Sequence, residues 1–463
     1  MLRLTTIPMQ NYHFIFRKNS TEKKPFNKKG ILKALVSLFC ISFGIRIILE
    51  YFSIKNSAYL LPDSLDYIRL AKDLSLHFTY GANSAEIFRV PIYPLFLSIF
   101  QKCSLPYFFE SVLTIQSFID SLSACLIFLI SYKLLDKKNI SFPFIAAILY
   151  AVSPLAISSS LLILSETLFV FLLMLLIFSI TYKTELKNFL PAFVNGILMG
   201  VLCLTRAVFI PISVIYILFF FFKFKKIKFA VLTTIIFVAI IFSWSYRNYY
   251  KTGYFGISTV SSINLYRYNA CAVDANLKSK SFADMQKSYD QKLESIKGAK
   301  EQAVFAKEEG TKVISSNLSR YMYMHLRATG NTLLPAAGDL FRIFGCNIGS
   351  DGTLSVINTK GLISGIKYYF KDNYLLLILS IPFTLLLILE YILGIVGFIS
   401  SMNKKNKSLI TLLAITAIYF LLVSGVGGTP RFRLPAEPII FIFAAIGLKH
   451  IISQIGCLKR KKH

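Results

Sequence analysis

The sequence predicts an all-α, polytopic membrane protein. Of its 463 residues, 55% are hydrophobic and only 16% are charged, and the mean hydropathy is +0.60. Ordinary soluble domains are far less apolar. Near-continuous apolar runs recur that are long enough for a hydrocarbon core of roughly 30 Å, and such runs must be helical because lipid cannot satisfy backbone polar groups. A β-barrel would instead alternate apolar and polar residues.

The apolar runs predict about ten transmembrane helices. The first run follows a basic leader and lacks a clear cleavage site, so we interpret it as a retained anchor. The segment 91–100 is apolar but too short to span, and we expect it at the membrane interface. The predicted spans are 31–52, 108–132, 141–157, 158–182, 190–205, 207–222, 229–247, 373–399, 409–423 and 434–453.

The formal net charge of +28 predicts topology rather than a nucleic-acid partner. Lys and Arg gather in short runs between the apolar segments, and the positive-inside bias places these runs and both termini in the cytoplasm. The runs are residues 1–30, Lys133 with Lys137 and Lys138, Lys183 with Lys187, Lys223 to Lys228, Lys404 to Lys407, and the tail 454–463.

We therefore expect five regions along the chain. They are the basic N-terminus 1–30, a transmembrane catalytic module 31–247 with its outer loop 53–107, an extracytoplasmic domain or long ordered loop 248–372, the last transmembrane helices 373–453, and the tail 454–463. We expect the polar region 248–372 to be mostly helical.

The first outer loop predicts a short amphipathic helix along the membrane. After Leu65, apolar residues recur at helical spacing, and charged residues fall on the opposite face. Asp63 follows Pro62 and is well placed as the N-cap, with Asp66 at the third helical position. We expect Asp66 to pair with Arg69, one turn away. On spacing alone, capping is the stronger interpretation of Asp63.

Ionisable residues converge on the predicted outer side of the membrane. Such groups are costly at membrane depth and are usually functional. The arginines could instead be snorkelling side chains, and the tyrosines could belong to the interfacial aromatic belt. The candidates are Asp63, Asp66, Tyr67, Arg89, Tyr93, Glu166, Arg206, Arg431 and Arg433.

The seven cysteines and five histidines do not predict a metal site, because none has the spacing of a ligand pair. Cys271 and Cys346 both fall on the outer side, where a disulfide is conceivable. Isolated apolar cysteines are the favoured interpretation.

The order of motifs resembles that of the GT-C superfamily of lipid-linked sugar transferases, in particular the bacterial branch related to protein mannosyltransferases and lipid A aminoarabinose transferases. No single motif would suffice, but the set spans roughly residues 31–453. Ile92 departs from the family pattern, which often has Gly there. The matching segments are Asp63-Ser64-x-x-Tyr67-x-x-x-Ala71-x-x-Leu74, Arg89-x-Pro91-x-Tyr93-Pro94-Leu95-Phe96, Leu164-Ser165-Glu166-Thr167-Leu168-Phe169, Leu204-Thr205-Arg206 and Arg431-Phe432-Arg433-Leu434-Pro435-Ala436-Glu437-Pro438.

This resemblance implies transfer of a sugar from a polyprenyl-phosphate carrier to an acceptor hydroxyl on a glycan, a lipid (lipid A or lipopolysaccharide) or a protein, with inversion, at the outer face of a bacterial inner membrane. It favours Asp63 as the base, with Glu166 as a second acid. Arg431 and Arg433 would hold the carrier phosphate, and Tyr67, Arg89, Tyr93 and Arg206 would contact substrate. Asp66 is a secondary candidate, and no cofactor is implied with certainty.

Two other functions remain open. A transporter or flippase of a lipid-linked sugar would need ionisable groups near the midplane and often has internal repeats. A surface-glycan polymerase or ligase would also face outward but would use pyrophosphate-linked donors.

Overall fold

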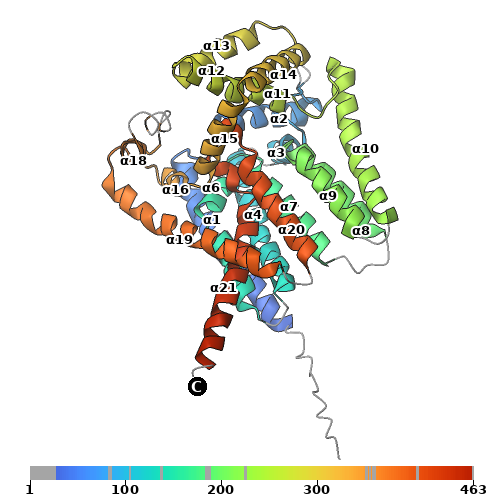
Figure 1. Cartoon of the computed structure of the whole chain (residues 1–463). Helices are drawn as coiled ribbons and strands as arrows, with labels where there is room; N and C mark the ends of the chain where they lie inside the picture. Colours follow the sequence, from blue (N-terminus) through green and yellow to red (C-terminus); the bar gives the residue numbers. More distant parts are fainter. Residues whose placement is uncertain are drawn as a thin grey trace, which may run out of the picture.

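The computed structural model describes residues 28–460, except 82–85, 104–105, 136–138, 183–188, 224–226, 403–405 and 350–360 apart from Thr353 and Val356. Within these residues the chain is helical and contains no strand (Figure 1). Much of the predicted cytoplasmic charge lies outside the described residues: the leader 1–27 and Lys137, Lys138, Lys183, Lys187, Lys225, Lys226, Lys404, Lys405, Lys461 and Lys462.

The predicted membrane bundle is present, with one helix or helix pair for each apolar run. Five helices are long and apolar enough to cross a membrane, and a sixth span is possible if one pair bent by 54° is counted. The long helices are α1 (Lys28–Lys55), α4 (Phe108–Leu134), α10 (Ile227–Thr252), α19 (Tyr374–Ser401) and α21 (Glu437–Arg460). The bent pair is α5 (Ser141–Ala151) with α6 (Pro154–Ser160), and the shorter apolar helices are α7 (Glu166–Tyr182), α8 (Leu190–Thr205), α9 (Phe209–Lys223) and α20 (Lys407–Leu422).

The bend between α5 and α6 moves one predicted boundary. Pro154 cannot continue α5, and the Ser153 side chain accepts a hydrogen bond from the Ala156 N–H, so a new helix starts there. The predicted span 158–182 was wrong at its start, because its first residues end α6 and α7 begins only at Glu166.

Shorter helices cover one end of the bundle. Two of them, α2 (Pro62–His77) and α3 (Ile92–Cys103), pack against each other. Above them a helical lobe contains α11 (Val260–Asn264), the π-helix η2 (Leu265–Ala270), α12 (Cys271–Leu277), α13 (Phe282–Glu294), α14 (Ala299–Ser316) and α15 (Leu318–Thr332), as Figure 1 shows. The chain returns through α16 (Ala337–Ile343) and α18 (Leu362–Phe370), and two short 3₁₀ turns, η3 (Gly425–Gly427) and η4 (Pro430–Arg433), join α20 to α21.

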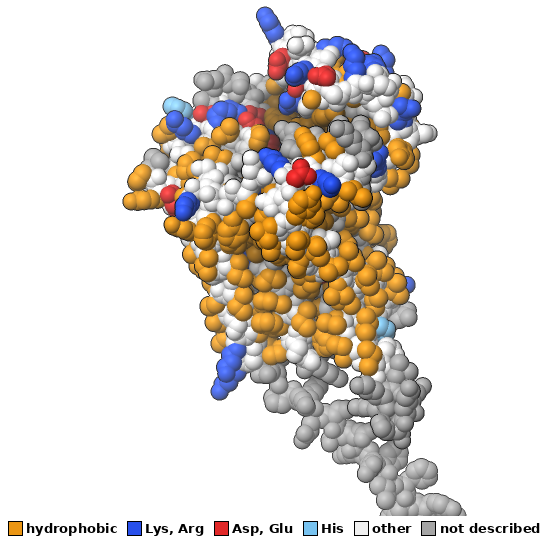
Figure 2. Space-filling model, turned by 90° about the vertical axis from the view of Figure 1, so that its left-hand side faces the viewer, with side chains coloured by type: hydrophobic (Ala, Val, Ile, Leu, Met, Phe, Trp, Pro, Cys, Tyr) orange, Lys and Arg blue, Asp and Glu red, His pale blue; other side chains and the backbone are white. Residues whose placement is uncertain are grey.

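The apolar and charged side chains on the surface follow the same division into bundle and lobe. Figure 2 shows apolar side chains over the bundle, and many of the charged ones around the end that carries the lobe. This distribution suits a multi-pass membrane protein with a polar domain on one side.

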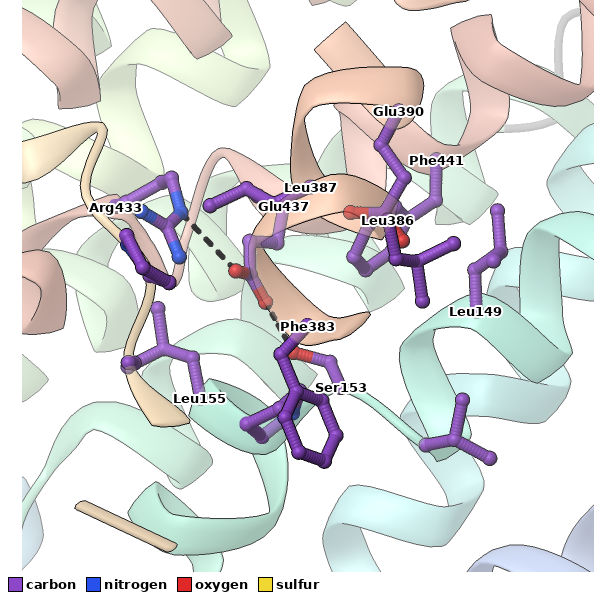
Figure 3. Close-up of a pocket in the computed structure, with 14 residues that line it drawn as sticks. Leu149, Ser153, Leu155, Phe383, Leu386, Leu387, Glu390, Arg433, Glu437 and Phe441 are labelled. Atoms are coloured by element: carbon purple, nitrogen blue, oxygen red, sulfur yellow. Dashed lines mark hydrogen bonds and ion pairs between the residues drawn. The ribbon is translucent and has the colours of Figure 1, made fainter. Parts of the chain in front are cut away.

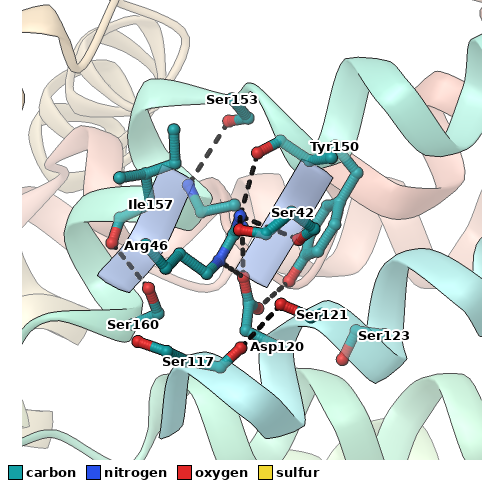
Figure 4. Close-up of polar contacts among 12 residues, drawn as sticks. Ser42, Arg46, Ser117, Asp120, Ser121, Ser123, Tyr150, Ser153, Ile157 and Ser160 are labelled. Atoms are coloured by element: carbon teal, nitrogen blue, oxygen red, sulfur yellow. Dashed lines mark hydrogen bonds and ion pairs between the residues drawn. The ribbon is translucent and has the colours of Figure 1, made fainter. Parts of the chain in front are cut away.

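Inside the bundle, one buried polar network joins three helices (Figure 4). Arg46 of α1 forms an ion pair with Asp120 of α4, and their side chains are 0% and 1% exposed. Tyr150 of α5 donates a hydrogen bond to Asp120. The Arg46 guanidinium also donates to the Ser42 and Ala151 carbonyls, at 3.0 and 2.9 Å. We call Arg46, Asp120 and Tyr150 the bundle network.

Candidate active site

The first turn of α2 presents the Asp63 carboxylate to the protein interior. Leu61, rather than Asp63, is the N-cap, and its N–H donates to the Ser64 hydroxyl at 3.0 Å. The predicted capping role of Asp63 was therefore wrong, because Pro62 already occupies the first helical position. Asp63 instead accepts hydrogen bonds from Arg89 at 2.8 Å and from Arg431 at 3.1 Å.

Asp66 lies on the same side of α2, one turn further along. Residues three apart on a helix are neighbours, so Asp63 and Asp66 both reach the Arg89 guanidinium. Asp66 accepts from Arg89 at 2.9 Å. Arg69 pairs with Glu86 at 3.0 Å and lies 3.9 Å from Asp73. The predicted pairing of Asp66 with Arg69 was wrong, because a residue distant in sequence provides the better partner.

Glu166, the first residue of α7, extends this arrangement into the bundle. Its carboxylate is 3% exposed and lies 2.9 Å from Arg431 and 2.7 Å from Arg206. Arg206 follows the last residue of α8. The result is a continuous alternation of charges, Arg89–Asp63–Arg431–Glu166–Arg206, in which each carboxylate lies between two arginines. We call these five residues with Asp66 the cavity cluster.

Electrostatic interactions within the cavity cluster keep Asp63 and Arg431 ionised. Burial would raise the pKa of Asp63, but the charges and hydrogen bonds of Arg89 and Arg431 outweigh burial and hold this pKa below its usual value. Burial would lower the pKa of Arg431, and the charges of Glu166 and Asp63 instead raise it. Asp63 is therefore a carboxylate at neutral pH.

The two predicted tyrosines occupy different positions. The Tyr67 ring lies under Arg89, with 5.0 Å between the guanidinium carbon and the ring centroid. Tyr93 is 0% exposed, packs edge-on against Tyr67 and donates to Gln116 at 2.6 Å. Tyr93 therefore supports Tyr67 from beneath, and its predicted role as a substrate contact is not supported by its burial.

Arg433 lies beside Glu437 in a separate pocket, which no member of the cavity cluster lines (Figure 3). Its side chain is 2% exposed, pairs with Glu437 at 3.1 Å and donates to the Thr332 and Leu334 carbonyls at 2.7 Å each. In a 3₁₀ turn, residues two apart project in different directions, so Arg431 and Arg433 diverge. The prediction that both would hold one phosphate is corrected: the geometry retains Arg431 alone.

A large cavity opens beside the cluster. Its volume is about 1790 Å³, well above the roughly 300–1000 Å³ of a typical single-ligand site. Its lining residues include all the members of the cavity cluster and Tyr67: Asp63, Asp66, Tyr67, Arg89, Glu166, Arg206 and Arg431. Helices α16, α18 and α19 contribute further lining residues, including Asp339, Arg342 and Tyr369, which were not among the residues predicted from the sequence. No motif or helical period marks these three within the polar region 248–372.

The part of the chain that the structure describes contains no group of three His, Cys, Asp or Glu side chains placed to hold a metal ion. Cys271 and Cys346 are both free thiols, so the conceivable disulfide between them is not formed.

No family model matches the sequence, and no curated protein matches it either. The structure is similar to the oligosaccharyltransferase of the archaeon Archaeoglobus fulgidus. In its apo form the TM-score is 0.50, with 15% identity over 94% of this chain and 52% of the archaeal one. In its complex with zinc and sulfate the TM-score is 0.51, with 16% identity over 91% and 49%. This chain thus spans about half the length of the archaeal protein. The likeness shows the fold, a helical membrane bundle shared with the archaeal oligosaccharyltransferase, and it agrees with the all-α polytopic architecture predicted above.

Proposed function

We propose that this chain is a membrane glycosyltransferase that moves a sugar from a polyprenyl-phosphate carrier to an acceptor hydroxyl. The observation that carries the proposal is the cavity cluster, in which Asp63 and Glu166 are joined by Arg431 beside a cavity of about 1790 Å³. The shared fold with an oligosaccharyltransferase supports the same reaction class. We place the cavity at the outer face of a bacterial inner membrane, with both termini in the cytoplasm.

Asp63 is the group we assign as the base. An acceptor hydroxyl must lose a proton as it attacks the anomeric carbon, and a carboxylate within hydrogen-bond reach can accept it. Asp63 fits because its side chain is 37% exposed and lines the cavity. Glu166 is nearly enclosed, so it acts by holding Arg431 and Arg206 in position.

Arg431 is the group we assign to the carrier phosphate. The bond between the anomeric carbon and the phosphate oxygen breaks, and the departing phosphate gains negative charge. A guanidinium stabilises that charge far better in a site with little water than in bulk solvent. Arg206 and Arg89, which flank Arg431 along the cluster, can add to the positive field around the same phosphate.

This arrangement also couples donor binding to the strength of the base. Asp63 is held at a low pKa by Arg89 and Arg431, and a carboxylate with a low pKa is a weak base. A phosphate that attracts Arg431 competes with Asp63 for that guanidinium. The pKa of Asp63 then rises, and the base becomes stronger when the donor is in place.

The acceptor is a glycan, a lipid or a protein that reaches the cavity from the lobe side. A cavity larger than most single-ligand sites has room for both the donor and the acceptor. Analysis of envelope glycans by mass spectrometry in a strain that lacks the protein would identify the missing sugar and its acceptor.

The transporter alternative has less support. A translocation path needs ionisable groups that substrate can reach inside the bundle, whereas Arg46 and Asp120 are 0–1% exposed and paired with each other. A polymerase or ligase is distinguished by its donor: transfer from a pyrophosphate-linked sugar, and not from a monophosphate-linked one, would favour it.

The decisive experiment uses the full-length protein in liposomes with a radiolabelled polyprenyl-phosphate sugar and crude envelope acceptor. We expect Asp63→Asn to reduce transfer by roughly 10²–10⁴-fold, because it removes the base. Glu308→Gln is the matched control, since Glu308 is exposed on α14 far along the chain from the cluster. Full transfer by Asp63→Asn would refute the assignment of the base, and translocation of the lipid without transfer would refute the function.

A further inference from the structure

Helix α16 carries a carboxyl group in the cavity wall that the proposed chemistry does not use. Asp339 lies in the first turn of α16, and it lines the same cavity as Arg431. Its electrostatic neighbours are Arg342, one turn further on, and Arg431. Burial raises the pKa of Asp339, and the charges of these two arginines offset this only in part.

Within the described part of the chain, Asp339 has no side-chain hydrogen bond, and no ion pair within 4.0 Å. Arg431, the second of these arginines, directs its guanidinium to Asp63 and Glu166 at 3.1 and 2.9 Å. Asp339 is only partly buried, so its carboxylate is open to the cavity, and its hydrogen-bond partners must come from there, from water or from a ligand. A cavity-lining carboxyl is explained if the ligand supplies the donors.

The wall that carries Asp339 is anchored on both sides of α16. Before the helix, Arg433 donates to the Thr332 and Leu334 carbonyls at 2.7 Å each. At its last residue, the Ile343 carbonyl accepts a hydrogen bond at 2.9 Å from the amide of Asn56, which follows α1. Such anchoring fixes a side chain in the geometry that selective recognition needs. It also gives the buried Arg433 a function, that of a positioning residue for this wall.

Tyr369 of α18 completes a surface suited to a sugar. Its hydroxyl packs so closely on Gly338 that a Cβ at this position would lie 1.8 Å from it, so any larger residue would displace the ring. Asp339 and Tyr369 thus present a carboxylate and an aromatic ring side by side at the cavity. The hydroxyl groups of a sugar can donate hydrogen bonds to the Asp339 carboxylate, and the apolar C–H groups of a pyranose can pack on the Tyr369 ring.

We propose that Asp339 is a specificity-determining residue that accepts hydrogen bonds from the hydroxyl groups of the transferred sugar, with Tyr369 as the adjoining wall. The inference rests on the proposed function and deepens it. A sugar phosphate would extend from Arg431, at the phosphate, toward Asp339, at the hydroxyls. Its anomeric carbon would then lie at the phosphate end, on the side of the cavity that carries Asp63.

The kinetic test compares wild type, Asp339→Asn and Asp339→Ala, each full length in liposomes, with polyprenyl-phosphate glucose as the donor. We expect the KM for the donor to rise roughly 10–100-fold while kcat changes little, because a contact made throughout the reaction contributes to binding rather than to the transition state alone. Asp339→Asn keeps the shape of the side chain and guards against misfolding, and Glu308→Gln is again the control. A rise in the KM for the acceptor instead would overturn the inference.

Donors that lack single hydroxyl groups make the test specific. Removing the hydroxyl that Asp339 recognises should raise the KM of the wild type for the donor. It should not raise the KM of the Asp339→Ala variant any further, since the contact is already lost in that variant. Equal losses in both proteins for every hydroxyl tested would refute the contact.

Binding of polyprenyl phosphate without a sugar separates this inference from the proposed function. Wild type and Asp339→Ala should bind it equally well in a thermal-shift assay, because Arg431 is intact. If the wild type transfers sugar and Asp339→Ala matches it with every donor, only the role of Asp339 is wrong. If the wild type neither binds the phosphate nor transfers sugar, the proposed function itself fails, and the inference fails with it.

Discussion

The cavity cluster and the bundle network use the same residue types and behave as opposites. Both pair arginine with carboxylate across helices that are distant in sequence. In the bundle network Arg46 and Asp120 are 0% and 1% exposed, whereas in the cavity cluster Asp63 and Arg431 are 37% and 25% exposed. An enclosed pair can only hold helices together, but a pair that meets a cavity can exchange its partner for a ligand.

The cost of breaking each cluster should differ for the same reason. Removing one member of an enclosed pair leaves the other charge buried without compensation, which destabilises the fold. Apart from Glu166, which is 3% exposed, the members of the cavity cluster have solvent or substrate as an alternative partner. Their loss should therefore appear chiefly in the reaction.

Arg46→Met should lower the free energy of unfolding by about 3–5 kcal/mol, because Asp120 is left as an unpaired buried charge. Thermal unfolding of the purified protein in detergent, or its yield in the membrane, would measure the loss. The double variant Arg46→Met/Asp120→Leu should recover most of this stability, since no charge then remains buried. If Arg46→Met were as stable as the wild type, the proposed difference between the bundle network and the cavity cluster would be wrong.

Arg431 and Arg433 offer the sharpest comparison. They are two residues apart in the sequence, but Arg431 lines the cavity and Arg433 is buried. Arg431→Gln should reduce sugar transfer by roughly 10²–10³-fold with little change in unfolding, as expected for loss of a group that stabilises developing charge. Arg433→Gln should instead mainly destabilise the protein, by about 1.5–3 kcal/mol, because Glu437 and two backbone carbonyls lose a charged donor. Transfer assays and thermal unfolding on both variants would show whether the effects divide in this way.

The smallest effect concerns pH. The pKa of Asp63 in the folded protein lies below its ordinary value of 3.8. The stabilising contribution of this carboxylate is therefore fully present above the pKa of the unfolded chain, and it is lost only as the pH falls through the lowered folded value. We expect no change in stability attributable to Asp63 between pH 5 and 8. Below about pH 4, the wild type should lose more stability than Asp63→Asn does. If the two proteins lost stability equally as the pH falls, this result would contradict the ion pairs of Asp63.

The sequence by itself determined the membrane helices and several residues of the candidate site. Hydropathy is a local property, and a run of apolar residues in lipid has one backbone solution, so the spans could be read directly. The motifs marked Asp63, Glu166 and Arg431, which the structure brings together.

Only the tertiary structure decided which partner each charge has. Helical spacing places Asp66 next to Arg69, but the packing of the chain brings Arg89 into an ion pair with Asp66. Asp63 and Arg431 are 368 positions apart, and no local rule connects them. The direction of Arg433 depends on one 3₁₀ turn, and Asp339 became visible only once α16 lined the cavity. Local periodicity constrains neighbours on one helix, whereas contacts between helices depend on how the whole bundle packs.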